Sequence, residues 1–177
     1  FCIALYRAIS QGKNYLFRTA ASFVRVLAGM ARKNYLENYI QGARGIIIVG
    51  SHTDKTTKQI KKASELDMVV PILFEVNGKE GTELSKESTK LSELCSELMK
   101  QNKIPLVYTS RQVVKSAAKE QALERSVQIS DAVQRIVANL QIKPDFVIAK
   151  GGITSSDIAT KALDIKKAIV IGQAAPG

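Results

Sequence analysis

Two glycines followed by hydroxyl side chains form the stretch of this sequence best suited to chemistry, "AKGGITSSD" at residues 149–157. Gly151 and Gly152 come directly after an apolar run and just before a segment with helical spacing. Glycine lets the backbone turn sharply and lets another group approach it closely. Thr154 or Ser155 could cap the helix that follows, and the free N–H groups at a helix start favour a bound phosphate.

The same pattern is also typical of a tight turn followed by an ordinary capped helix. Asp157 stands three residues after Thr154, as in a capping box with aspartate in place of glutamate. Its carboxylate would compete with a bound anion, whereas Lys150 and Lys161 would attract one. The residues of this stretch are therefore compatible with either a purely structural turn or a phosphate-binding site.

A second loop with glycine and hydroxyl side chains, Gly50-Ser51-His52-Thr53, also lies between a strand-like run and a helical segment. Ser51 offers a hydroxyl to a phosphate or a ribose, and Thr53 or Asp54 would cap the helix. His52 is the only histidine of the chain, and it lacks the partner ligands that a zinc site needs. A lone loop histidine is more often incidental than catalytic. Two such loops at strand ends could hold one nucleotide between them.

A third candidate is Arg18, which ends the strand-like run at 15–17 and is followed by Thr19. Its guanidinium could pair with a phosphate or a carboxylate through two hydrogen bonds. It could equally hold a structural carboxylate, and the sequence does not choose between these roles. The motifs GxxxxGK[ST] and GxGxxG are absent, which argues against Walker-type NTPases and standard dinucleotide folds.

The elements that would position these residues follow from the apolar pattern. Short runs that are apolar on both faces predict buried strands of a parallel sheet, at 15–17, 45–50, 69–74, 104–108, 146–149 and 168–171. Segments with a 3.6-residue period predict helices at 2–11, 22–40, 54–66, 84–101, 118–141 and 155–163. This alternation is typical of a three-layer α/β/α sandwich with a mainly parallel sheet, in which ligands bind at the carboxyl ends of the strands.

The composition predicts one globular domain over residues 1–177, since 45% of the residues are hydrophobic. No apolar run approaches the roughly 18 residues that would span a bilayer. Cys2 and Cys95 fit no metal spacing and are typical of a reduced, cytoplasmic protein. The formal net charge of +10 favours anionic partners. Because the basic residues are dispersed, a nucleic-acid interface is the weaker alternative.

Four stretches give the chain a resemblance to the nucleotide-binding domain of the four-carbon acid sugar kinase family. They are "GKNYLFRTAASFVR" at 12–25, "VGSHTDKTTKQI" at 49–60, "PDFVIAKGGITSSDIATKAL" at 144–163 and "GQAAPG" at 172–177. The third stretch is the most specific, and the resemblance runs over essentially the whole chain.

The resemblance implies a kinase that transfers the γ-phosphate of Mg-ATP to the terminal hydroxyl of a four-carbon sugar acid. The acid would be 3-oxo-tetronate, threonate or erythronate. The residues implied to contact ATP belong to the two loops described above, and they are Ser51, Gly151, Gly152, Ile153 and Thr154. Lys150 and Arg18 would be further charge partners of the phosphates.

The resemblance also implies a second domain, N-terminal in the same chain, that binds the sugar acid and supplies the catalytic base. We therefore expect this chain to be the C-terminal half of a longer kinase and to be inactive alone. A homodimer is compatible with this view. The alternatives are a non-catalytic nucleotide-binding module and a nucleic-acid-binding module, which would lose affinity steeply with salt.

Overall fold

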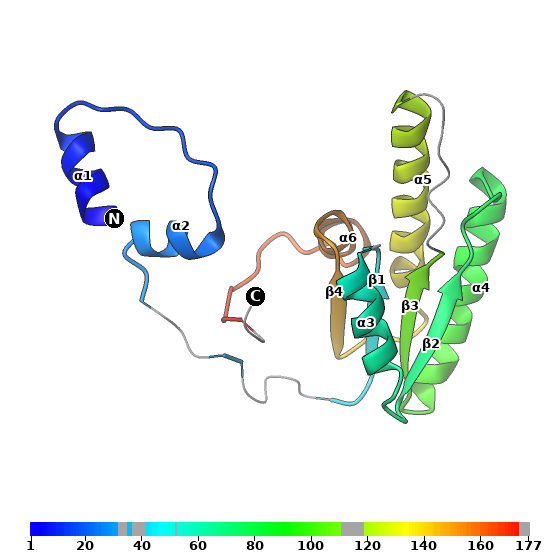
Figure 1. Ribbon diagram of the computed structural model, residues 1–177. Helices are drawn as coiled ribbons and strands as arrows, with labels where there is room; N and C mark the ends of the chain where they lie inside the picture. The colour runs from blue at the N-terminus through cyan, green and yellow to red at the C-terminus, as the bar shows by residue number, and fades with distance from the viewer. Residues whose placement is uncertain (32–34, 37–41, 52, 111–118, 174–177) are drawn as a thin grey trace. The chain divides into compact units, whose positions relative to one another are not determined.

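The computed structural model describes residues 1–31, 35–36, 42–51, 53–110 and 119–173 (Figure 1). It divides into two compact units, one of Phe1–Tyr39 with Val170–Gly177 and one of Ile40–Ile169. The second unit contains both loops with glycine and hydroxyl side chains. The prediction of one nucleotide-binding domain over 1–177 stays a prediction.

A four-stranded sheet forms the centre of the second unit. Its strands are β1 (Gly45–Val49), β2 (Val69–Phe74), β3 (Ile104–Thr109) and β4 (Phe146–Lys150), in the order β2-β3-β1-β4. All three pairings are parallel, and Val49 lies opposite both Tyr108 and Lys150. β-Branched residues such as Ile46, Ile47 and Ile48 favour this extended backbone. The segments after β1, β3 and β4 therefore leave the sheet at one edge.

Helices cover both faces of the sheet, as the three-layer prediction requires (Figure 1). One face packs against α4 (Gly81–Lys100), α5 (Lys119–Ala138) and the π-helical turn η1 (Ile158–Ala162), which continues α6 (Gly152–Asp157). The other face packs against α3 (Asp54–Ala63). Ile46 and Ile48 point into the larger core, and Val49 points into the smaller one, because successive strand residues face opposite sides.

The first unit consists of α1 (Cys2–Ser10) and α2 (Ala21–Leu27) with the chain between and after them. The Tyr6 hydroxyl donates to the Leu27 carbonyl and joins the two helices. The rings of Phe1 and Phe17 each lie against that of Phe23, with centroids 5.7 and 5.6 Å apart. These contacts form a small aromatic cluster in which Phe1 and Phe17 remain exposed.

Two predicted strands are wrong, since neither 15–17 nor 168–171 belongs to a strand. Leu16 is fully exposed and Ile169 is 89% exposed. An apolar run forms a strand only where a neighbouring strand can take up its N–H and C=O groups. A short apolar run does not reveal whether such a neighbour exists.

The helix predicted at 22–40 ends much earlier, because α2 stops at Leu27. Gly29 follows in a left-handed conformation with φ +67°, a backbone geometry that commonly ends a helix. Residues 32–34 and 37–41 of the predicted range lie outside the described residues. Of the helices in the described part of the chain, none has both the length and the apolar character needed to cross a membrane.

Burial of Cys95 in the larger core gives a direct test of this packing. Its thiol is 0% exposed, and desolvation raises its pKa from 9.0 to about 12. Because the thiolate is the reactive form, we expect Cys95 to resist iodoacetamide at pH 8 while the half-buried Cys2 is alkylated. Mass spectrometry of native and urea-unfolded protein measures this difference. Rapid native labelling of Cys95 would contradict the core described here.

Candidate nucleotide site

The two loops with glycine and hydroxyl side chains lie side by side at the carboxyl edge of the sheet. They follow β1 and β4, which are adjacent strands. The Gly50 N–H donates to the Lys150 carbonyl at 3.0 Å, so the pairing continues one residue beyond β1. The sequence predicts both loops at strand ends, and the sheet order brings them together.

Glycine is required at two positions for this close approach. A Cβ atom on Gly50 would lie 2.0 Å from Thr154 Oγ1, which is far inside van der Waals contact. Gly151 has φ +120°, a conformation that other residues rarely adopt. A Cβ there would lie 3.6 Å from the Ser51 nitrogen. The Thr154 hydroxyl therefore fills the space that Gly50 leaves, and the two loops touch.

Space remains open in front of Gly152. A Cβ atom built there meets no other atom within 4 Å, and Ile153 is 74% exposed. Gly152, Ile153 and Thr154 are the first three residues of α6, so their N–H groups have no acceptor within the helix. An anionic group entering this space would meet these donors.

The start of α6 differs from the prediction, because the helix begins at Gly152 with Gly151 as its N-cap. Thr154 is not a cap, and the capping box with Asp157 is not formed. The Ser155 hydroxyl instead lies 2.9 Å from the Ala149 carbonyl and 2.7 Å from that of Gly151. The positive φ of Gly151 turns the chain from strand to helix within one residue, so Thr154 and Ser155 lie inside the helix and not at its N-cap.

Asp157 and Lys161 are engaged with α5. Ser130 donates to the Asp157 carboxylate at 2.6 Å, and Lys161 Nζ lies 3.1 Å from it. The Ser130 hydrogen bond and, to a lesser extent, Lys161 hold the pKa of Asp157 below its usual value. Lys161 also lies 3.6 Å from Asp131. The Asp157 carboxylate is thus stabilised by Ser130 and Lys161, and Lys161 forms ion pairs with both Asp157 and Asp131.

The Ser51 side chain is fixed by hydroxyls at the start of α3. Thr53 caps this helix as predicted, since its Oγ1 accepts the Thr56 N–H at 3.3 Å. Thr56 Oγ1 donates to Ser51 Oγ at 3.0 Å. Thr56 was not among the site residues predicted from the sequence. Its position three residues after a threonine cap was a usable signal, because that residue faces the cap in the first helical turn. His52 lies outside the described residues.

Polar residues that follow β2 and β3 lie at the same end of the sheet, beyond the carboxyl ends of the strands. Buried Ser110 accepts hydrogen bonds from the Val76 N–H at 3.1 Å and from Asn77 Nδ2 at 3.0 Å. The pKa of Glu75 is lowered mainly by a hydrogen bond from Ser110 and next by one from the Asn77 backbone. Nothing in the sequence pattern of this stretch shows that a hydroxyl from another strand meets it.

The two predicted charge partners differ in position. Lys150 is the last residue of β4, half-buried, and its carbonyl holds Gly50. Arg18 is exposed in the first unit, so its pairing with a phosphate stays a prediction. Of the predicted contact residues, the structure thus brings together Ser51 and the four residues of Gly151–Thr154.

A family model described as the nucleotide-binding C-terminal domain matches residues 46–177, which contain both loops. The chain belongs to this family. No curated protein and no solved structure matches the chain. Membership identifies residues 46–177 as a nucleotide-binding domain, and the paired loops lie within it.

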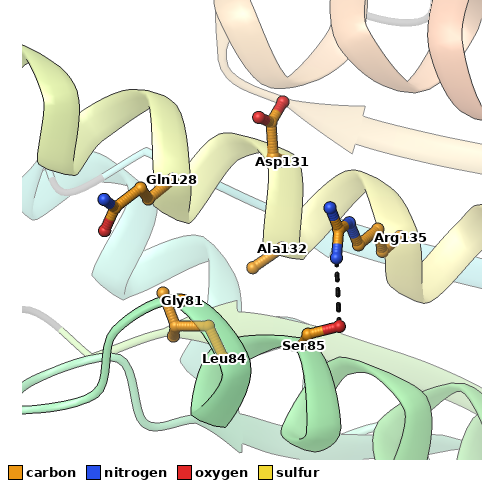
Figure 2. A pocket seen from close by; sticks show the side chains of 7 residues that line it. All are labelled: Gly81, Leu84, Ser85, Gln128, Asp131, Ala132 and Arg135. Carbon is orange, nitrogen blue, oxygen red and sulfur yellow. Dashed lines mark hydrogen bonds between the residues drawn. The ribbon is translucent and has the colours of Figure 1, made fainter.

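A metal site and a cavity between two helices are weaker candidates than the paired loops for binding a ligand in this domain. Within the residues that the structure describes, no group of three or more histidine, cysteine, aspartate or glutamate side chains could hold a metal ion. A cavity of about 110 Å³ lies between α4 and α5, where Arg135 donates to Ser85 at 3.0 Å (Figure 2). It is well below the roughly 300–1,000 Å³ of typical ligand pockets, and no predicted contact residue lines it.

Replacing Gly50 with alanine tests the contact between the loops. We expect Gly50→Ala to lower the free energy of unfolding by about 1–3 kcal/mol, as overpacking does, because its methyl group collides with Thr154. Urea denaturation measures the change. Gly152→Ala is the matched control, since the added methyl group enters open space and should alter stability by less than about 0.5 kcal/mol. Equal stability of the two variants would contradict the described contact.

Proposed function

We propose that the paired loops bind ATP and that the chain is the nucleotide-binding half of a kinase. The proposal rests above all on one observation. In a member of a nucleotide-binding family, two loops with exposed main-chain donors touch through Gly50 and Thr154 and leave open space at Gly152. The N–H groups of Gly152, Ile153 and Thr154 and the hydroxyl of Ser51 would hold phosphate oxygens.

Phosphoryl transfer suits such a site, since it depends on positioning and on stabilising charge and needs little covalent chemistry from the protein. Mg²⁺ would enter as the Mg-ATP complex, because it keeps its waters and binds through substrate phosphates. When bound, it would balance charge on the phosphates. The fixed donors of the two loops would hold the triphosphate in place, and Lys150 would add positive charge beside them.

We further propose a four-carbon sugar acid as the phosphate acceptor, namely 3-oxo-tetronate, threonate or erythronate. The four stretches that resemble the sugar-acid kinases support this choice. In this proposal the acid and the catalytic base belong to an N-terminal domain of the same longer chain. The protein acts in carbohydrate metabolism in the cytoplasm, a setting that suits the free thiols of Cys2 and Cys95. A homodimer also fits the proposal.

A carboxylate placed at Gly152 tests the nucleotide site. We expect Gly152→Asp to weaken Mg-ATP binding at least about a hundredfold in calorimetry, since like charges brought together cost several kcal/mol. Gly152→Ala is the control for charge, since its methyl group enters the same space without a carboxylate and should weaken ATP binding much less than Gly152→Asp does. Equally tight ATP binding by Gly152→Asp would count against this site.

The kinase assignment has its own test. We expect the full-length protein with Mg-ATP to phosphorylate at least one of 3-oxo-tetronate, threonate and erythronate, as followed by ADP release. The Gly152→Asp variant should lose this activity. Tight ATP binding without transfer to any of the three acids would contradict the sugar-acid kinase and favour a non-catalytic nucleotide-binding module.

A further inference from the structure

Thr56 is a buried polar residue next to the proposed site. It is 1% exposed and lies in the first turn of α3. Its hydroxyl contacts two others, Ser51 Oγ at 3.0 Å and Thr53 Oγ1 at 2.9 Å. A buried hydroxyl without partners is costly, so this cluster is held together by its own hydrogen bonds.

The direction of these bonds decides what Ser51 can do. A threonine hydroxyl has one proton and two acceptor positions. Thr56 donates its proton to Ser51 Oγ. Ser51 therefore acts as the acceptor in this bond, and its own proton is left to donate to a third group.

The Thr56 hydroxyl is not needed to cap α3. The cap is the bond from the Thr56 main-chain N–H to Thr53 Oγ1, and any residue with an N–H can make it. Valine has nearly the shape of threonine and would retain that bond. The distinctive contribution of the Thr56 side chain is therefore its hydrogen bond to Ser51.

We propose that Thr56 is a positioning residue that orients the Ser51 hydroxyl toward a phosphate oxygen of the bound nucleotide. The inference rests on the proposed nucleotide site and makes it more specific. A Ser51 hydroxyl that accepts from Thr56 donates outward, so it selects a ligand group that accepts hydrogen bonds. Hydrogen-bond chains of this kind also strengthen their terminal donor. Phosphate oxygens, which are acceptors only, match this arrangement.

Calorimetry with ATP, ADP and adenosine on the full chain tests the proposal. Thr56→Val should weaken ATP and ADP binding about three- to tenfold, the worth of one hydrogen bond, and leave adenosine binding unchanged. Thr56→Ser, which restores the hydroxyl, should bind ATP as the parent protein does. Thr160→Val is the matched control, because it removes a hydroxyl bonded to the Ser156 carbonyl on an exposed helix turn.

A double-mutant cycle separates orientation of Ser51 from a general structural role. If Thr56 acts through Ser51, Thr56→Val adds no further loss of ATP affinity in a Ser51→Ala background. Thr56→Ala provides a second variant, with the same expectation, should valine disturb the packing. Thermal melting identifies any variant that is unfolded.

Three results would overturn the inference. The first is that folded Thr56→Val binds ATP as tightly as the parent protein does. The second is that Thr56→Val weakens adenosine binding as much as ATP binding. The third is that Thr56→Val weakens ATP binding as much in the Ser51→Ala background as it does in the parent protein. These outcomes are distinct from failure of the proposed function, in which the parent chain itself binds no ATP or binds it unaffected by Gly152→Asp.

Discussion

The contact between Gly50 and Thr154 is the constraint on which the candidate site depends. Parallel pairing of β1 with β4 places two loops at one edge of the sheet, but only the missing side chain of Gly50 lets them touch. The hydrogen bond from Gly50 to Lys150 fixes their register. With that register set, the donors at the start of α6 and the Ser51 hydroxyl lie on two loops in contact.

The side chains around this contact bind to the protein and leave the main-chain donors free. Ser155 is bound to carbonyls at the end of β4, and Asp157 is bound to Ser130 of α5. Ser51 is held by Thr56. Because these polar side chains are held by bonds within the protein, the loops are in place before a ligand arrives, which reduces the ordering cost of binding. Such preorganised donors are what phosphoryl transfer requires.

The sequence predicted the strands of the sheet from their apolar runs. The run at 45–50 became β1, a central strand that is buried on both faces, and such burial leaves a continuous apolar pattern. The run at 146–149 became the edge strand β4, which is only partly buried, with Ile148 47% exposed. The run at 168–171 has the same pattern without a strand partner, and local sequence does not record partners. The helix start at Gly152 and the Thr56–Ser51 bond were missed for a related reason. The helix start depends on the backbone angle of Gly151, which residue types do not specify, and the spacing of Thr56 from the cap signals a contact with Thr53 but not the bond to Ser51.

Amide chemical shifts during an ATP titration test the central claim most directly. With isotope-labelled protein and Mg-ATP, the largest shifts should fall on the amides of Gly50, Ser51 and Gly151–Thr154, which surround the open space at Gly152. Shifts concentrated elsewhere, such as at the α4–α5 cavity near Arg135, with these amides unmoved, would contradict the account.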